Sequence, residues 1–196
     1  FALKKTLALE QFDTVLLLHA SQRLTLPLCS LLGAQTIIGT TGINKGLDDL
    51  FTNPQPPLYE HEIIRRLKMV EKIGGSIHSE SLSFFPDPKE KMQRLEPGAW
   101  IALHPGSKDR FKRWPIENWA RLCDELALKY NWRTIITGSK EDLVLVEQLT
   151  KITKAKPIIA VGQTSITQLA ALIKKCQVYL TSDSAPLHIA LSMAVP

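Results

Sequence analysis

The second half of the chain alternates between short apolar segments and longer segments with helical periodicity. The short segments have the length and β-branched content of buried strands, and they cover residues 100–106, 132–138, 157–162 and 177–182. The longer segments repeat apolar residues at helical spacing, and they cover residues 115–130, 139–153, 164–176 and a last stretch from Ser184. Strands and helices that alternate about every 25 residues predict a parallel, doubly wound sheet with right-handed crossovers.

The first half shows a similar but less regular pattern. Apolar runs at 12–18 and 35–40 predict two strands, and a helix is predicted from about Ser21 to Gly33. A second amphipathic helix is predicted over 58–75, and the turn-rich residues 41–57 are predicted to be loop.

A charged segment with three prolines, "SFFPDPKEKMQRLEPGAW", separates the two halves. Such a composition is typical of a linker. We therefore expect an α/β protein of two Rossmann-like, doubly wound domains, both incomplete. Their expected limits are residues 1–92 and 99–196, with 93–98 as linker.

Three helices of the second half begin with capping patterns. Ser139 and Asp142 form one capping box, and Ser165 and Gln168 form another. In "SDSAPLHIALSMAVP" the last helix has Asp183 or Ser184 as its cap and Pro186 in its first turn.

Composition limits the classes of binding partner but does not identify one. The chain of 196 residues is 44% hydrophobic and 22% charged, which is ordinary for a globular protein. A net charge of +5 and a pI near 9.1 favour an anionic partner, which is nucleic acid, a phosphate-bearing small molecule or an acidic membrane surface. The three separated cysteines are interpreted as buried thiols, and no apolar run is long enough to span a membrane, so a cytoplasmic protein is expected.

A basic loop follows the strand at 100–106. In "HPGSKDRFKRWP", Gly106 and Ser107 precede four cations, which are Lys108, Arg110, Lys112 and Arg113. Glycine lets backbone approach an anion closely, and the cations would neutralise a diphosphate. The same residues also fit a basic loop that is simply exposed to solvent.

The segment after the next strand is a second candidate. In "TGSKED", Gly138 precedes a helix start at which Glu141 would accept hydrogen bonds from a ribose. Alternatively, this carboxylate only complements the helix dipole.

The last helix start is the third candidate, because capping explains only part of its motif. His188 lies four residues after Ser184, where a ring nitrogen would donate to a phosphate oxygen. A buried histidine satisfied within the protein is the alternative.

Together these motifs resemble a known family. Residues 99–196 resemble the C-terminal domain of bacterial glycosyltransferase family 9, the lipopolysaccharide heptosyltransferases. The resemblance rests on "HPGSKDRFKRWPIENWARL", "ITGSKED", "VGQTSITQLAALI" and "TSDSAPLHIALSMAVP", in the family's order and spacing. The first half is similar through "FDTVLLLHASQRLTLPLCSLLGAQTIIG" and the His-x-x-x-Arg helix "HEIIRRLKMVEKIG".

The resemblance implies a GT-B enzyme of two Rossmann-like domains. It implies inverting, metal-independent transfer of heptose from ADP-L-glycero-D-manno-heptose to the lipopolysaccharide inner core, with no cofactor. Lys112 matches the lysine that stabilises the leaving diphosphate. The implied donor-binding residues are Ser107, Lys108, Lys112, Gly138, Glu141, Asp183, Ser184, Ala185 and His188, and Ala185 stands where many members have glycine.

The resemblance also implies what lies outside this chain. The family's general base would precede Phe1, and the end of the sheet would follow Pro196, so the chain is expected to be a fragment that binds donor at best. On the acceptor side the implied residues are Arg23, His61 and Arg65, while Arg66 is interpreted as part of a solvated helix face. The basic balance also fits peripheral association with the inner membrane.

Other classes fit the sequence less well. A nicotinamide-dependent oxidoreductase would share the fold, but no G-x-G-x-x-G follows any strand. A nucleic-acid-binding protein would share the charge, but the cations are spread along the chain with few aromatic residues among them, so no nucleic acid is expected. Another nucleotide-sugar GT-B transferase and a non-catalytic ADP-binding protein remain as alternatives.

Overall fold

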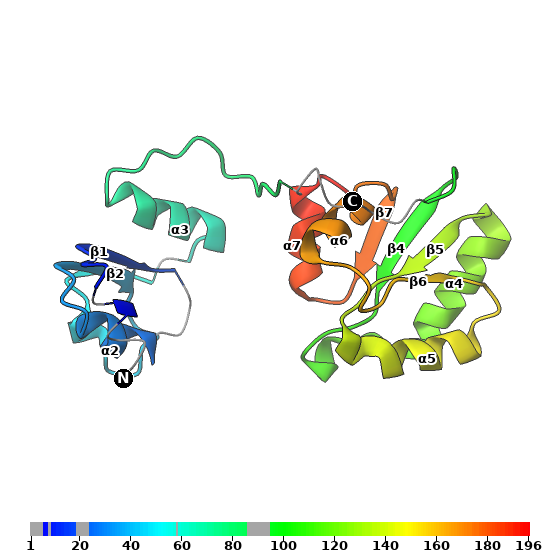
Figure 1. Cartoon of the computed structure of the whole chain (residues 1–196), viewed down its shortest axis with the longest axis horizontal. Coiled ribbons are helices and arrows are strands. Elements are labelled where there is room, and N and C mark those ends of the chain that lie inside the picture. Colours follow the sequence, from blue (N-terminus) through cyan, green and yellow to red (C-terminus); the bar gives the residue numbers. More distant parts are fainter. Residues whose placement is uncertain (1–5, 8, 19–23, 58, 86–94) are drawn as a thin grey trace. The chain divides into compact units, whose positions relative to one another are not determined.

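The computed structural model describes all residues except 1–5, 8, 19–23, 58 and 86–94. The chain forms two compact units, Phe1–Glu80 and Ser81–Pro196, each with its own parallel sheet (Figure 1). The domain limits expected from the sequence stay a prediction, and residues 93–94 of the expected linker lie outside the described residues.

The sheet of the second unit confirms the four predicted strands. They are β4 (Trp100–His104), β5 (Arg133–Ile136), β6 (Ile158–Ile159) and β7 (Val178–Thr181), and all pair in parallel in the order β6-β5-β4-β7. β4 is hydrogen-bonded on both sides, and all five of its residues are buried. A strand buried on both faces explains why its sequence is continuously apolar.

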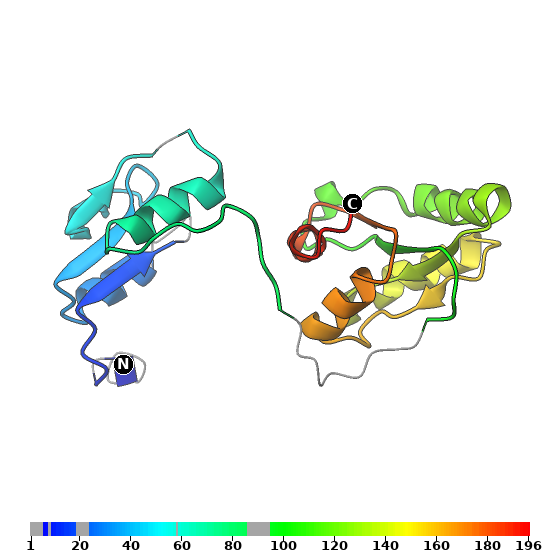
Figure 2. The ribbon, with the colours of Figure 1, turned by 90° about the horizontal axis from the view of Figure 1, so that it is seen from above.

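Helices cover both faces of this sheet. They are α4 (Ile116–Tyr130), α5 (Leu143–Ile152), α6 (Ile166–Ile173) and α7 (Ala185–Ser192), with short 3-10 turns η2 (Arg110–Lys112) and η3 (Lys140–Asp142). Trp100 and Ala102 of β4 pack with residues of α6 and α7, whereas Ile101 and Leu103 pack with α4 and α5. Successive side chains of a strand point to opposite faces. The predicted doubly wound arrangement is confirmed, and Figure 2 shows α4 and α6 on opposite sides of the sheet.

The predicted capping boxes are also present. The amide of Ser165 donates to Gln168 Oε1 at 3.0 Å, and the amide of Gln168 donates to Ser165 Oγ at 3.1 Å. The carboxylate of Asp142 accepts from the Ser139 amide and hydroxyl, both at 2.8 Å. These bonds satisfy amides that a helix start leaves unpaired.

The first unit contains a smaller parallel sheet in the order β1-β2-β3. Its elements are β1 (Thr14–Leu17), α2 (Thr25–Ser30), β2 (Thr36–Thr40), η1 (Asp48–Leu50), β3 (Asn53–Gln55) and α3 (Glu62–Glu71). Leu17, Leu26 and Phe51 belong to its core, and the Phe51 ring lies where a Cβ on Gly39 would be 2.2 Å away. A residue with a Cβ at position 39 would collide with that ring, so this position of β2 requires glycine.

Two sequence predictions for this unit are wrong. Residues 41–57 are not all loop, because they contain β3, which pairs with β2 despite Pro54. Proline lacks an amide to donate, but an edge strand such as β3 tolerates it. The helix expected from about Ser21 begins at Thr25, so that Pro27 stands in its first turn, where a missing amide costs little.

Within the described residues, no helix combines the length and the apolarity that crossing a membrane requires. The three cysteines are free and buried, as predicted.

Asp124 of α4 ties the end of α5 to the body of the second unit. It accepts from the Thr153 hydroxyl and the Ala155 amide, both at 2.7 Å, and from the Lys154 amide at 2.8 Å. Burial raises the pKa of Asp124, but these hydrogen bonds outweigh it and hold the pKa below its usual value. We expect Asp124→Ala to lower the free energy of unfolding at pH 7 by about 1 to 3 kcal/mol, measured by urea denaturation.

The effect has a defined pH window. Because the pKa is depressed in the folded protein, the stabilisation is present above the unfolded pKa and is lost as the pH falls through the folded one. The difference between Asp124→Ala and the parent should therefore shrink below about pH 4. Glu125→Ala is the control, since Glu125 makes only surface ion pairs, and an equal loss in both variants would contradict the assignment.

Candidate functional site

A cavity of about 500 Å³ lies in the second unit at the carboxyl ends of β4, β5 and β7. The chain leaves β4 toward β5 on one side, and β7 pairs on the other, so the strand order reverses at β4. Ligands of open parallel sheets bind at such a switch point, because the loops there diverge. The predicted donor-binding residues that line the cavity are Ser107, Lys108, Lys112, Gly138, Glu141, Asp183, Ser184 and Ala185.

An ion pair spans the mouth of the cavity. Lys112 Nζ lies 2.6 Å from Asp183 Oδ2, although the two residues are 71 positions apart. Their hydrogen bond and opposite charges raise the pKa of Lys112 and lower that of Asp183, so both are ionised at neutral pH. Both side chains are about half exposed or more, which makes the pair weak and its lysine available to another anion.

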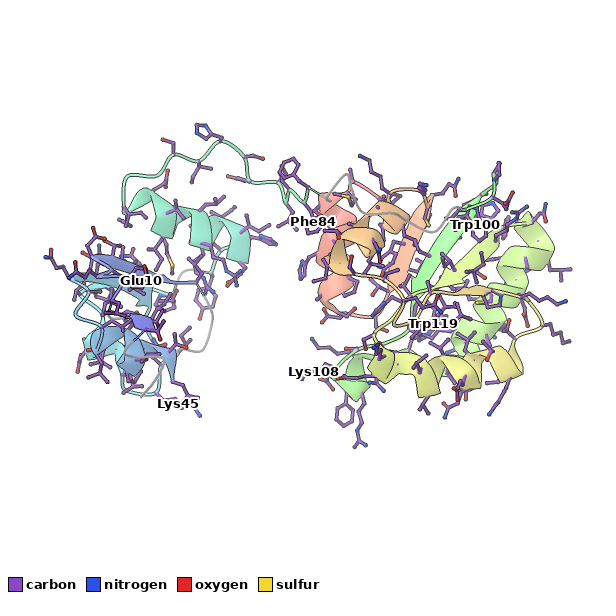
Figure 3. The ribbon with its side chains drawn as sticks, in the orientation of Figure 1. Glu10, Lys45, Phe84, Trp100, Lys108 and Trp119 are labelled. Carbon is purple, nitrogen blue, oxygen red and sulfur yellow. The ribbon has the colours of Figure 1, made fainter. Side chains whose placement is uncertain are left out.

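The basic loop is anchored at Ser107 and Arg113, while its residues 108–115 are exposed to solvent. Ser107 is buried, its hydroxyl donates to the Asp183 carbonyl at 3.3 Å, and its own carbonyl accepts from Arg113 Nε at 2.7 Å. Arg113 lines the cavity as well, and it is one of the four cations that the sequence predicts to neutralise a diphosphate. Lys108 lies beside η2 at the edge of the unit, whereas Trp119 lies within it (Figure 3). Lys112 and Arg113 are the cations of the loop that line the cavity and are held by hydrogen bonds.

Gly106 is required by the protein's own carboxylate. A Cβ on Gly106 would lie 2.4 Å from Asp142 Oδ1, and the buried Asp142 is already held by Ser139. The sequence reasoning assigned the close approach at Gly106 to a ligand anion. The structure instead shows that Asp142 occupies this side of the glycine.

The start of α7 differs from its predicted capping. Ser184 is the N-cap residue, but its hydroxyl bonds to Thr181 Oγ1 and to the Ser182 carbonyl, both at 3.1 Å, and it does not cap the helix. Asp183 turns to Lys112 instead. The predicted N-cap position and Pro186 in the first turn are confirmed. Neither side chain caps the helix, because polar groups of β7, of the residue after it and of η2 bond to them instead.

His188 is exposed on α7 and does not line the cavity. Its charge is the weakest of the causes that lower the pKa of Asp183, which indicates that the two residues are near each other. Its assignment to the donor site stays a prediction.

A buried histidine in the cavity wall was missed by the sequence reasoning. His104 is 7% exposed, lines the cavity, and has Nδ1 3.1 Å from Thr137 Oγ1. Burial lowers the pKa of His104, and the nearby charge of Asp142 opposes this effect. Its position at the end of a strand was the available signal. Residues 164–166 and Leu169, around the start of α6, also line the cavity and were not predicted.

The predicted acceptor-binding residues belong to the first unit. His61 is the N-cap of α3, and its Nδ1 accepts from the Ile63 amide at 3.4 Å. Arg65 and Arg66 both pair with Glu62. Arg23 lies outside the described residues. These roles stay predictions.

Metal-ligating side chains do not gather in the part of the chain that the structure describes. No group of three or more His, Cys, Asp or Glu side chains is placed there to hold a metal ion.

Comparison with known proteins identifies related sequences. The family model for glycosyltransferase family 9 (heptosyltransferase) matches residues 1–196. Lipopolysaccharide heptosyltransferase 3 of Escherichia coli K12 is 26% identical over 156 residues, which are 74% of this chain and 45% of that protein. Lipopolysaccharide core heptosyltransferase OpsX of Haemophilus influenzae is 34% identical over 98 residues, 49% of this chain and 28% of that protein. The matches therefore span less than half the length of these relatives.

Solved structures share the fold. A glycosyl transferase of family 9 from Veillonella parvula superimposes with a TM-score of 0.77 at 23% identity, over 98% of this chain and 59% of its own. The E. coli heptosyltransferase WaaC with ADP gives a TM-score of 0.70 at 14% identity, over 100% of this chain and 64% of its own. These likenesses confirm the expected α/β fold of GT-B type.

The contact between Gly106 and Asp142 is testable. We expect Gly106→Ala to lower the free energy of unfolding by about 1 to 3 kcal/mol, because the fixed carboxylate cannot retreat from the new methyl group. In an Asp142→Ala background the same substitution should cost much less. Urea denaturation of the four proteins measures this coupling, and additive effects would show that the carboxylate is not the obstacle.

Proposed function

This chain belongs to glycosyltransferase family 9, and on that basis we propose that its cavity binds ADP-heptose for transfer of heptose to a lipopolysaccharide-core acceptor. The observation that carries the proposal is the Lys112–Asp183 pair at the mouth of a cavity at the sheet's switch point. The names of the relatives support the sugar and the acceptor, and the structural neighbour solved with ADP supports the nucleotide. As the matched relatives are longer, the activity of a whole protein is part of the proposal.

The proposed reaction is one displacement at the anomeric carbon. An acceptor hydroxyl forms the new carbon–oxygen bond and loses its proton to a carboxylate, while the bond to the diphosphate breaks and ADP leaves. Attack opposite the leaving group inverts the anomeric centre. The general base is not assigned to a residue of this chain.

Lys112 is proposed to stabilise the leaving diphosphate. Negative charge grows on the phosphate as the bond breaks, and a well-placed donor at such a centre contributes about 3 to 4 kcal/mol. Arg113 lines the same cavity and adds a second cation. Two cations on the cavity wall support a mechanism in which the protein itself, without an essential metal, neutralises this charge.

Asp183 is proposed to hold Lys112 over the cavity until the donor binds. The exposed ion pair is weak, whereas a diphosphate offers several anionic oxygens to the same ammonium group. Lys112 would therefore shift toward the ligand without losing a buried interaction. Ser184 also lines the cavity, and its hydroxyl would add a neutral donor by turning from the Ser182 carbonyl, to which it donates in the structure.

The nucleoside is proposed to lie toward β5 and α6. Glu141 is exposed in the cavity wall, where its carboxylate would accept from ribose hydroxyls. Ile166 is 65% exposed although it lines the cavity, and with Leu169 it offers an apolar surface for the adenine. On the acceptor side, His61 and Arg65 stay proposed contacts. The protein is also proposed to be cytoplasmic and to associate peripherally with the inner membrane.

The role of Lys112 can be tested on donor binding. We expect Lys112→Ala to weaken ADP binding about tenfold or more, because a charge-assisted contact to phosphate is lost. Isothermal titration calorimetry measures the Kd. Lys129→Ala is the matched control, since it also removes a lysine from a surface ion pair but lies outside the cavity. Where transfer is measurable, Lys112→Ala should lower kcat by a larger factor than it weakens ADP binding.

The ligand class can be tested by thermal shift. The chain is screened with ADP, UDP, NAD and a short oligonucleotide, and we expect the largest increase in Tm with ADP, because a ligand stabilises the state that it binds. Stabilisation by NAD or the oligonucleotide, but not by ADP, would overturn the proposed function.

A further inference from the structure

One aromatic ring in the cavity wall, that of His104, has no part in the proposed recognition of phosphate charge. His104 ends the central strand β4, is only 7% exposed, and lines the cavity. Its Nδ1 faces Thr137 of the segment after β5, and Thr137 in turn contacts Tyr179 of β7. Three neighbouring strands thus place these three side chains together.

The Thr137 hydroxyl has one proton and three neighbours. It lies 3.2 Å from the Leu103 carbonyl, 3.2 Å from the Tyr179 hydroxyl and 3.1 Å from His104 Nδ1. A carbonyl oxygen accepts only, whereas a tyrosine hydroxyl and a ring nitrogen can each donate. All three contacts are hydrogen bonds only when Thr137 donates to Leu103 and accepts from both Tyr179 and His104.

This arrangement fixes the tautomer of His104. Nδ1 carries the proton, so Nε2 carries a lone pair and is the ring nitrogen left for the cavity. No hydrogen bond joins Nε2 to any residue that the structure describes. Burial lowers the pKa of His104 and keeps the ring neutral at pH 7, although the charge of Asp142 opposes this effect.

A neutral Nε2 acceptor selects its partner by chemistry. It repels phosphate oxygens, which also accept, and it matches a hydroxyl group, which donates. Phosphate recognition therefore belongs to the cations at the cavity mouth, and His104 provides a separate, directional contact.

We propose that His104 Nε2 accepts a hydrogen bond from a hydroxyl group of the bound nucleotide sugar, and that Thr137 is the positioning residue that fixes this tautomer. The inference rests on the proposed function for the identity of the ligand. The hydroxyl belongs either to the ribose or to the transferred sugar, and both present the same donor.

The tautomer is tested without any ligand. Long-range ¹H–¹⁵N correlation spectra of the His104 ring should show a protonated Nδ1 and an unprotonated Nε2 at pH 7. Thr137→Ser keeps the hydroxyl and should preserve this pattern, whereas Thr137→Val should give a tautomer mixture. Tyr179→Phe is the matched control, because it removes a neighbour of Thr137 but not the acceptor of His104. A protonated Nε2 in the parent protein would overturn the proposal.

The ligand contact is tested by calorimetry with inorganic pyrophosphate, ADP and ADP-heptose. His104→Asn retains a donor toward Thr137 but lacks the Nε2 acceptor, so it should leave pyrophosphate binding unchanged. We expect it to weaken binding about tenfold for ligands that present the hydroxyl. A loss already seen with ADP identifies the ribose, and a loss confined to ADP-heptose identifies the sugar.

The outcomes separate this inference from the proposed function. Equal weakening of all three ligands, or of none, would overturn the hydroxyl contact even when ADP binds tightly to the parent. Failure of the parent to bind ADP and ADP-heptose would overturn the proposed function and this contact together, and the ring spectra would still decide the tautomer.

Discussion

The hydrogen bonding of β4 to β5 on one side and to β7 on the other is the interaction on which the second unit depends. A strand with parallel neighbours on both edges needs crossovers that cover both faces, and the two buried clusters above and below β4 are the result. The same pairing brings the ends of three strands to one edge. Residues as distant in sequence as Ser107, Ser139 and Asp183 therefore line one cavity.

Two aspartates that line the cavity, Asp142 and Asp183, differ in how deeply they are buried. Asp142 is buried and held by two hydrogen bonds from Ser139, so it fixes the turn after β5, against which Gly106 of the loop after β4 packs. Asp183 is exposed and has only the ammonium group of Lys112 as its ion-pair partner among the described residues. A carboxylate satisfied by fixed donors maintains structure, whereas an exposed pair rearranges at low cost. The two aspartates thus have different consequences for a bound anion.

Periodicity predicted the second unit well because its central strand β4 is fully buried and two of its helix starts carry capping boxes. The first unit was predicted less well, since β3 is a three-residue edge strand that contains Pro54 and has no apolar run. At the site, the loops after strands predicted most of the cavity wall. The contact between Lys112 and Asp183 depends on the pairing of β4 with β7, which spacing along the chain does not reveal. The bond between Ser184 and Thr181 is local, but the sequence alone does not decide between it and a helix cap.

The network around His104 shows why such features need coordinates. Its members are 33 and 42 positions apart, and each is an ordinary residue in or directly after a strand. Only their distances reveal that a single hydroxyl proton must satisfy a carbonyl, which in turn determines the tautomer of the ring. Cations tolerate many arrangements of a diphosphate, but a buried acceptor left unpaired is costly. A site that combines these cations with the His104 acceptor would bind many nucleotides by charge and would discriminate among them by the position of one hydroxyl group.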